Sequence, residues 1–357
     1  MDTCWYFITE QGGLIMKRSN IFFVFLLLIS SMMLFTAFDD CFAQDKVITL
    51  RYSDHTNVGD PLYDIVDRWC KEVEKRTDGK IRVRHYPVGS LNSPMQMYES
   101  ITQGVVDIGN HLLGYTQGRF PQTVLAYDCP WEYSDAHTST KVATEFNLKF
   151  RPKEFDGVKV MYFHSTASAI LFARKPVNRL EDLRGMKIRT QGPNARIMSQ
   201  FGVIPVGMPV MEVYDALSKG MVDGITTTYA AMKMWSLGDL IKYAIEYRGS
   251  SFVALAVVAM NKDKWNTIPP DLRKIIEDIN REWVKKHTNA QETAEKIGED
   301  YVISKGVQVS RLSPEENAKW TAKANVLFDE YVANMKQKNL PGDEAVRFVR
   351  DIVRNAR

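Results

Sequence analysis

The sequence lacks the short motifs that mark the commonest classes of enzyme. It contains no G-x-S-x-G, G-x-G-x-x-G or G-x-x-x-x-G-K-[ST] pattern, so it shows no nucleophile elbow, dinucleotide fingerprint or phosphate-binding loop. Its histidines are few and have no paired metal-ligand spacing; they stand at positions 55, 85, 111, 137, 164 and 287. We therefore expect a protein that is not an enzyme and that has no cofactor and no metal.

The sequence also has no block of basic residues with interleaved aromatics, the usual pattern of a nucleic-acid-binding protein, so we expect no nucleic-acid partner. Lysine and arginine number 46 against 43 acidic residues, giving a formal charge of +3. A weakly cationic chain of this kind suits anionic small ligands. At 357 residues and 45% hydrophobic content, it is long enough for two domains of ordinary size.

Only the N-terminal region carries a long hydrophobic run. Lys17 and Arg18 precede the apolar segment from Ile21 to Phe38, and the small residue Ala43 follows it. This order is typical of a secretory signal peptide, so we expect export across the inner membrane and no membrane insertion after cleavage. An uncleaved membrane anchor is the alternative, because the run is nearly long enough to span a bilayer.

Two of the four cysteines lie in the expected signal segment, residues 1–43, and would be removed with it. Residues 1–15 precede Met16, the expected start, and are interpreted as an upstream extension. Loss of two basic and four acidic residues raises the formal charge from +3 to +5. Cys70 and Cys129 remain, each in an apolar stretch. A disulfide is possible in an oxidising compartment, and two buried free thiols are the preferred interpretation.

The opening third of the remaining chain alternates predicted strands and helices. The pattern predicts strands at 47–52, 81–86 and 105–109 and helices at 61–76 and 95–103. This order indicates an α/β fold with a mostly parallel sheet and helices on its faces.

The same pattern returns later in the sequence. Residues 205–207 and 214–224 repeat the Pro-Val-Gly loop at 87–89 and the segment 98–108. Each copy has a helix closed by a glycine that leads into a strand. Copies more than a hundred residues apart predict two similar lobes, not a solenoid. Asp107 and Asp223 occupy equivalent places and are interpreted as turn or cap residues, not as a catalytic pair.

Further elements are predicted to connect the two lobes. Strands at 158–163 and 169–173 are followed by a loop with a one-turn helix at 175–185, and the apolar run 252–260 predicts a buried strand that returns to the first lobe. A long helix at 272–303 is expected to span both lobes, followed by helices at 318–338 and 343–355.

One arginine in the second copy has the position of a ligand-binding residue. Arg189 ends a short apolar strand and precedes the loop 190–193, and open α/β sheets bind ligands where strands end. A guanidinium makes two parallel hydrogen bonds to one carboxylate, which lysine cannot do. The sequence therefore predicts that Arg189 binds a carboxylate.

Several motifs together resemble one known family. LEDLRGMKIRT, EVYDALSKGMVDG, GKIRVRHYPVGSL and QGVVDIG are similar to the substrate-binding proteins of tripartite ATP-independent periplasmic (TRAP) transporters, and the likeness runs from Val47 to about Asn339. The resemblance implies a two-lobed periplasmic binding protein, type II-like, with each lobe a mixed sheet flanked by helices. It implies a periplasmic protein that captures an organic acid and passes it to a small and a large membrane subunit driven by an ion gradient.

The resemblance also divides the chain and suggests binding residues. Lobe I is expected from residues 46–166 and 255–294, and lobe II from 167–254 and 295–357. The arginine of the family's K-I-R motif, which binds the ligand carboxylate, maps onto Arg189. The full set of expected ligand-binding residues is Arg189, Thr227, Ala169, His111, Leu112, Tyr115, Val210, Phe172, Tyr229, Asp54 and Asn57.

Departures from the family pattern narrow the expected ligand. Ala169 stands where a second carboxylate-binding arginine is common, Thr227 stands where an asparagine often occurs, and the loop 110–115 has little charge. One cation among hydroxyls and apolar walls predicts a monocarboxylate with an apolar or aromatic body, such as an aromatic, indole-type or branched 2-oxo acid.

Several alternatives remain open at this point. The ligand could be a C4-dicarboxylate or a 2-oxo acid if Arg174, Arg196 or Arg248 enters the site. Some members of the family bind their acid through a cation, which His111 and Asp54 could hold. Trp235 and Tyr229 could stack on a ligand or fill the core. The protein could also serve a sensor instead of a transporter, or be an exported enzyme on the same scaffold.

Overall fold

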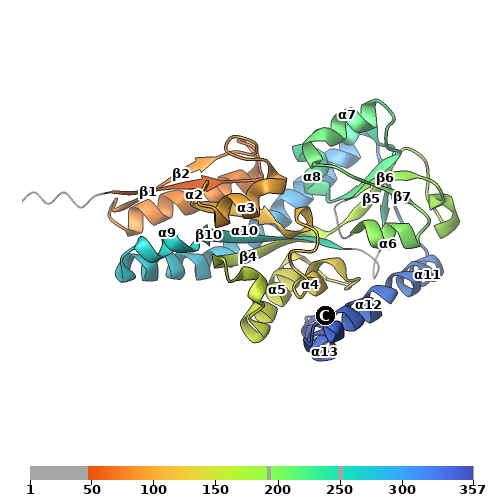
Figure 1. The fold of residues 1–357 in the computed structure, drawn as a ribbon. Helices are drawn as coiled ribbons and strands as arrows, with labels where there is room; N and C mark the ends of the chain where they lie inside the picture. Colours follow the sequence, from red (N-terminus) through yellow and green to blue (C-terminus); the bar gives the residue numbers. More distant parts are fainter. Residues whose placement is uncertain (1–46, 191–193, 248–251, 357) are drawn as a thin grey trace, which may run out of the picture. The chain divides into compact units, whose positions relative to one another are not determined.

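The computed structural model describes residues 47–190, 194–247 and 252–356 (Figure 1). The expected signal segment, 1–43, lies outside the described residues. Residues Ile48–Arg357 form one compact unit, which contains two separate mixed sheets. This confirms the predicted fold: two lobes, each with a mixed sheet flanked by helices. We use lobe I for the part around the five-stranded sheet and lobe II for the part around the six-stranded sheet.

Lobe I has the strand order β2-β1-β3-β10-β4. β1 pairs in parallel with β2 and β3, and β10 runs antiparallel to both β3 and β4. Its strands are β1 (Ile48–Ser53), β2 (Ile81–Tyr86), β3 (Ile108–Leu112), β4 (Val158–Ser168) and β10 (Val253–Asn261). Its helices are α2 (Pro61–Arg76), η2 (Pro94–Gln96), α3 (Met97–Thr102), η3 (Leu113–Tyr115), α4 (Val124–Asp128), α5 (Ala136–Phe150), η4 (Lys153–Phe155) and α9 (Lys262–Thr267).

Lobe II has the strand order β11-β9-β5-β8-β6-β7. β6 pairs in parallel with β7 and β8, and β5 runs antiparallel to β8 and β9. Its strands are β5 (Ile170–Ala173), β6 (Lys187–Thr190), β7 (Ile204–Gly207), β8 (Gly224–Thr227), β9 (Tyr243–Glu246) and β11 (Gln308–Arg311). Its helices are η5 (Leu180–Leu183), α6 (Asn194–Gln200), η6 (Val210–Glu212), α7 (Val213–Ser218), α8 (Tyr229–Met234) and η7 (Gly238–Leu240).

The sequence repeat is a structural repeat. In both lobes a central strand, β1 or β6, pairs in parallel with the next two strands of its own copy. Gly104 and Gly220 follow the equivalent helices with φ of 72° and 69°, a conformation that favours glycine. The Asp107 carboxylate accepts a hydrogen bond from the Arg51 amide at 2.7 Å, and that of Asp223 accepts one from the Lys187 amide at 2.8 Å. Both aspartates therefore hold a strand within their own lobe.

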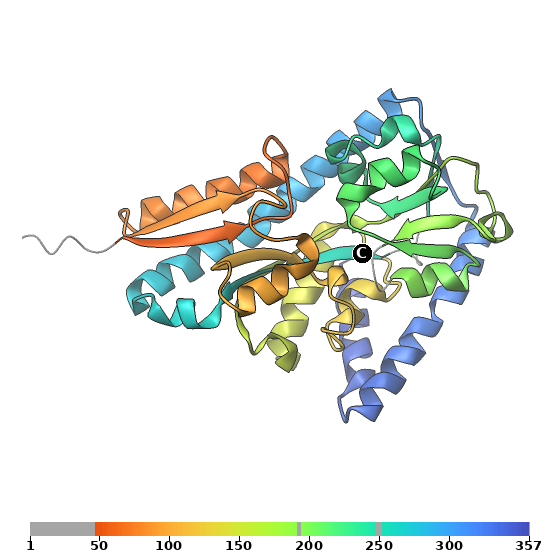
Figure 2. The same ribbon diagram turned by 45° about the horizontal axis from the view of Figure 1, so that its top comes forward.

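Before the C-terminal helices, three segments cross between the lobes. β4 leads into β5, β9 leads into β10, and the 35-residue helix α10 (Pro270–Ser304) packs on α2 and β4 in lobe I and on α8 in lobe II (Figure 2). The two strand crossings are joined to each other, since the Ala169 amide donates to the Phe252 carbonyl at 2.8 Å. This arrangement confirms that the long helix spans both lobes.

The contact of α10 with α8 depends on two residues of the long helix. The Glu295 carboxylate accepts hydrogen bonds from the Tyr229 and Ala230 amides, at 2.9 and 3.0 Å, which satisfies the free N–H groups at the start of α8. One turn on, a Cβ on Gly298 would lie 2.2 Å from the Tyr229 backbone. Only glycine allows the two helices to approach this closely.

The last three helices cover both lobes. α11 (Pro314–Ala324) packs on α6, whereas α13 (Gly342–Asn355) packs on α4 and α5 of lobe I, with α12 (Val326–Gln337) beside it (Figure 1). The Tyr331 hydroxyl of α12 donates to the Gln122 carbonyl at 3.2 Å. Cys70 and Cys129 are buried free thiols, which agrees with the preferred interpretation.

Two predicted elements differ from the observed ones. The strand expected at 105–109 begins three residues later, as β3, because Asp107 turns back to bond with Arg51 before the pairing of Tyr52 with Ile108 begins. The single helix expected at 318–338 is two helices, α11 and α12, which meet at Asn325.

Candidate ligand-binding site

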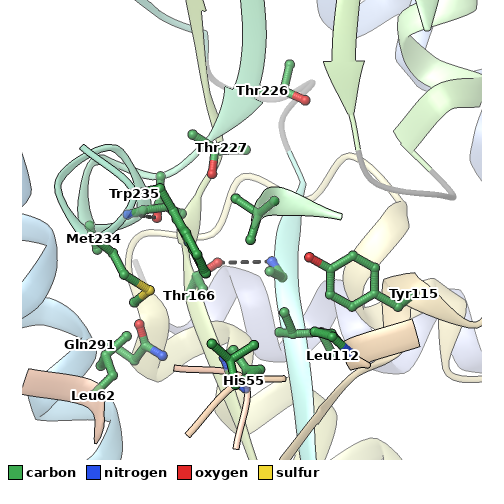
Figure 3. Close-up of a pocket in the computed structure, with 18 of the residues that line it drawn as sticks. His55, Leu62, Leu112, Tyr115, Thr166, Thr226, Thr227, Met234, Trp235 and Gln291 are labelled. Atoms are coloured by element: carbon green, nitrogen blue, oxygen red, sulfur yellow. Dashed lines mark hydrogen bonds between the residues drawn. The ribbon is translucent and has the colours of Figure 1, made fainter. Parts of the chain in front are cut away.

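A pocket lies between the two lobes, at the ends of strands from both (Figure 3). From lobe I and α10 it is lined by His55, Leu62, Val88, Pro94, Leu112, Tyr115, Thr166, Ala254 and Gln291. From lobe II and the crossing strands it is lined by Ala169, Val210, Thr226, Thr227, Thr228, Ala230, Ala231, Met234, Trp235 and Phe252. Leu112 and Thr227 are the last residues of β3 and β8, and His55 follows the end of β1; α/β sheets position ligand-binding groups at these strand ends.

The chemistry of the lining is apolar, aromatic and hydroxyl. Trp235 and Tyr115 supply aromatic surface from opposite sides, and Thr226 and Thr227 lie at one end (Figure 3). Within the described lining there is no lysine, arginine, aspartate or glutamate. The space open to the centre of a water molecule is about 80 Å³, whereas one water needs roughly 10–15 Å³. The cavity is therefore of a size for a small organic molecule.

Arg189 lies behind this lining and is fully buried. Its Nε and Nη2 atoms both donate to the Met208 carbonyl, at 3.1 and 2.8 Å. Burial lowers the pKa of Arg189 below its ordinary value, and the charge and hydrogen bonding of Tyr115 oppose that shift. Tyr115 lines the pocket, so it connects the guanidinium to the cavity. No carboxylate among the described residues pairs with Arg189.

A buried polar network lies beneath the lobe I end of the pocket. The Asp54 carboxylate accepts hydrogen bonds from the His55 amide at 2.7 Å and the Asn110 side chain at 3.1 Å, and it lies 3.0 Å from His85 Nε2. Burial alone would raise the pKa of Asp54. The hydrogen bond of His85 and the charges of His55 and His85 outweigh that effect, so the pKa is lowered and the group stays ionised at neutral pH.

The structure brings five of the expected binding residues to the pocket. These are Leu112, Tyr115, Ala169, Val210 and Thr227. Arg189 is not among the lining residues, but its neighbour Tyr115 is. The others lie elsewhere: Phe172 is in the lobe II core against Tyr229, whose hydroxyl donates to Glu246 at 3.2 Å, and Asn57 faces a separate surface cavity.

His111 and Asp54 belong to no cluster of metal-ligating residues in the described part of the chain. The His111 ring is buried, with Nε2 2.8 Å from the Thr116 hydroxyl, and burial lowers its pKa to about 3. Asp54 belongs to the network described above. Across the ranges 47–190, 194–247 and 252–356, no group of three or more His, Cys, Asp or Glu residues is placed to hold a metal ion.

The further arginines do not line the described pocket. The Arg174 side chain donates to the Leu217 and Leu240 carbonyls. Arg196 pairs with Glu330 of α12 and lines a different cavity. Arg248 lies outside the described residues.

Comparison with known proteins assigns the chain to a family. The sequence profile of DctP, the bacterial extracellular solute-binding protein family 7, matches residues 52–334. The chain belongs to this family. This confirms the resemblance to TRAP substrate-binding proteins, and because the family and its structural neighbours are transport binding proteins, it confirms that the protein is not an enzyme.

Individual relatives of this family 7 protein are distant. It is 26% identical to the uncharacterized protein YiiZ of Salmonella typhimurium over 207 residues, 56% of this chain and 62% of that protein. It is 25% identical to the C4-dicarboxylate-binding periplasmic protein DctP of Rhodobacter capsulatus over 262 residues, 72% of this chain and 78% of that protein. A TRAP solute-binding protein from Rhodoferax ferrireducens, solved with copurified benzoate, superimposes with a TM-score of 0.81 at 25% identity, covering 87% of this chain and 98% of that one.

The family is periplasmic and extracellular. In the described part of this family 7 chain, no helix combines the length and the apolar character that a membrane crossing requires.

Sequence reasoning missed several lining residues of this family 7 protein. His55 follows Asp54 in the polar cluster after β1, but nothing in the sequence distinguishes it from its neighbours. Gln291 lies on the buried face of α10 with Asn280 and His287. Polar residues at the spacing of a buried helical face were the available signal, because such groups need partners.

Proposed function

We propose that the protein captures a small organic acid through Arg189 and delivers it to the small and large membrane subunits of a TRAP transporter. The burial of Arg189 carries this proposal. This fully buried guanidinium is bonded to one carbonyl and is in contact with a tyrosine, so among the described residues its charge is not neutralised in a low-dielectric site. Such a charge is expensive unless it is paired, and a ligand carboxylate supplies the missing partner.

The geometry of Arg189 supports a directed interaction. Because Nε and Nη2 both face the Met208 carbonyl, one edge of the planar guanidinium is fixed by the protein. The end of the group, formed by its two Nη atoms, is left to face a carboxylate bidentately. Tyr115, beside Arg189 and in the pocket wall, would hydrogen-bond the same carboxylate.

The remaining lining favours a monocarboxylate with an apolar or aromatic body. A second carboxylate would meet no cation among the described lining residues, and leaving it unpaired in a closed site costs several kcal/mol. Ala169, which lies at the strand crossing and is 3% exposed, offers only a methyl group. The benzoate bound by the Rhodoferax ferrireducens protein supports an aromatic acid.

A C4-dicarboxylate is the second candidate, because the Rhodobacter capsulatus relative is named for binding one. The two candidate ligands differ in the number of cationic side chains needed to pair with their carboxylates. Benzoate, phenylacetate, succinate and malate can be compared by isothermal titration with the protein after removal of copurified ligand. The proposal expects the aromatic monocarboxylates to bind more tightly than the dicarboxylates.

Two results would decide against parts of the proposal. Tighter binding of succinate or malate would favour the second candidate. Binding of no carboxylate, together with a copurified compound that mass spectrometry shows to lack an acid group, would exclude organic-acid capture itself.

A further inference from the structure

The lobe I end of the pocket carries two polar side chains whose free atoms can be assigned from their partners. His55 and Gln291 both line the pocket and lie at the end away from Thr226 and Thr227 (Figure 3). Both are next to His164: the His55 and His164 rings are parallel with centroids 6.2 Å apart, and Gln291 Nε2 lies 3.5 Å from His164 Nδ1. The same network around Asp54 therefore sets the orientation of both.

The tautomer of His55 follows from the atoms near its Nδ1. This nitrogen lies 3.3 Å from the Asn110 carbonyl oxygen and 3.5 Å from Asp54 Oδ1. Both neighbours can only accept hydrogen bonds, so Nδ1 carries a proton, and in the singly protonated tautomer that this fixes, Nε2 holds a lone pair. Within the described residues Nε2 has no hydrogen-bond partner. It is an acceptor available to the pocket.

A chain of hydrogen bonds fixes Gln291 in the same way. Asp54 is acceptor-only, so Asn110 must point its amide nitrogen at Asp54 and its Oδ1 at His164 Nε2, 2.8 Å away. His164 Nε2 is then the donor and Nδ1 the acceptor. Burial and the charges of His287 and His55 lower the pKa of His164 well below its ordinary value, so the ring carries one proton.

Gln291 completes this chain. Its amide nitrogen faces the His164 Nδ1 lone pair, and its Oε1, for which the described residues provide no donor, is left for the pocket. The His164 ring is held in place by stacking on His287, with centroids 3.7 Å apart, and His287 Nδ1 lies 3.3 Å from the Tyr162 hydroxyl. The network therefore presents two acceptors, His55 Nε2 and Gln291 Oε1, at one end of an otherwise apolar cavity.

We propose that the ligand is a carboxylic acid that carries a hydrogen-bond donor, O–H or N–H, at the end opposite its carboxylate, and that His55 and Gln291 bind this donor. The inference rests on the proposed function, because it assumes that the carboxylate lies at Arg189. An unsubstituted aromatic acid leaves both acceptors unpaired in a desolvated site, whereas a hydroxyl or indole N–H satisfies one of them. Specificity of this kind follows from unpaired groups in the binding site.

The test compares ligands that differ in the donor alone. Isothermal titration of the wild-type protein would use 3- and 4-hydroxybenzoate against the corresponding fluorobenzoates, and indole-3-acetate against benzothiophene-3-acetate. We expect at least one donor-bearing acid to bind roughly tenfold more tightly than its partner, as one net hydrogen bond provides. The hydroxybenzoate and indole pairs distinguish an O–H from an N–H donor.

Variants connect this preference to the two side chains. Gln291→Leu and His55→Phe should each reduce the preference at least threefold while the donor-free acid still binds, which also shows that the variant is folded. Gln103→Leu, at an exposed position outside the pocket, is the matched control and should keep the wild-type ratio.

Equal affinities within every pair in the wild-type protein would overturn the donor assignment while leaving organic-acid binding intact. A preference that survives both pocket variants would likewise overturn the role of His55 and Gln291. If no carboxylate binds, the proposed function fails as well, so the two failures are distinguishable.

Discussion

At the scale of single residues, Arg189 combines full burial with the lack of a carboxylate partner among the described residues. We expect Arg189→Met to weaken binding of the preferred acid by about 2–4 kcal/mol, the range for removing one partner of a buried charge pair. The unliganded protein should keep or gain stability, because methionine removes a desolvated charge. Isothermal titration and thermal unfolding of the free protein measure the two effects.

The matched control for this prediction is Arg179→Met. Arg179 is 68% exposed and pairs with Asp182 on the surface, so its replacement should change neither affinity nor stability by more than about 0.5 kcal/mol. A loss of affinity in Arg189→Met that is no larger than in Arg179→Met would contradict the role of Arg189.

Single residues also show where sequence reasoning reaches its limit. Arg189 stood out because a guanidinium at a strand end inside a specific motif has few structural uses. Gln291 lies 102 positions later in a helix, and its approach to the pocket depends on how α10 packs against β4. His55 could be placed near the cleft, but its free nitrogen is defined only by the distances to Asn110 and Asp54. Contacts between distant segments of this kind carry no local pattern.

At the scale of elements, Glu295 connects α10 to the start of α8 and is half-buried beside the acidic Glu292. Burial raises its pKa to about 7, although the Tyr229 and Ala230 amides oppose the shift. An ordinary glutamate has a pKa near 4.5, so between pH 4.5 and 7 the folded protein retains a proton that the unfolded chain has lost. The contribution of Glu295 to the free energy of unfolding should therefore fall as pH rises from 4.5 to 7, by about 3 kcal/mol in total.

Glu295→Gln tests this pH dependence. The variant cannot ionise, so its free energy of unfolding in urea should fall less than that of the wild type between pH 4.5 and 7. The test compares the slopes of the two pH curves and not their absolute values, because the glutamine side chain also offers one acceptor oxygen fewer to the backbone amides of α8. Glu315→Gln, at a side chain that is 82% exposed, should follow the wild-type curve. Parallel curves for wild type and Glu295→Gln would contradict the assignment.

The close contact between α10 and α8 at Gly298 provides a second prediction. Gly298→Ala would normally favour a helix by up to about 1 kcal/mol, but here the new methyl group would lie 2.2 Å from the Tyr229 backbone. We expect a net loss of about 1–3 kcal/mol from overpacking, measured by urea unfolding. Gly207→Ala is the control, because a Cβ there meets nothing within 4 Å. A stabilised Gly298→Ala would show that α8 moves at little cost.

Element boundaries were predictable where sequence and local chemistry agree. Helix α2 begins at Pro61 after the Asp60 cap and ends at Arg76, as expected. The start of β3 was not predictable, since Val105 and Val106 have strand propensity but the Asp107 contact with Arg51 delays pairing. The contact between Asp107 and Arg51, which lie 56 positions apart in the sequence, therefore moves the start of β3 by three residues.

At the scale of the whole molecule, the two-lobed fold followed from the repeated motif, and the division at the proposed residue boundaries stays a prediction. α12 and α13 show why such boundaries are difficult: they follow lobe II strands in the sequence, yet α13 packs on α4 and α5 of lobe I. The sequence contains amphipathic helices but not the surface that each one covers.

The lobes are joined by two hydrogen-bonded strand crossings, by helix α10 and by the C-terminal helices, and the pocket takes residues from both lobes. Binding at such a site is expected to close the cleft by a hinge motion.

We therefore expect the preferred acid to reduce the radius of gyration in small-angle X-ray scattering, and to alter the fluorescence of Trp235 in the pocket wall. At one hundred times Kd it should stabilise the folded protein by about 2.7 kcal/mol. Arg189→Met at the same ligand concentration should show a much smaller change in all three. Stabilisation without compaction would indicate a ligand that binds an already closed protein, and would refute hinge closure as the response to the acid.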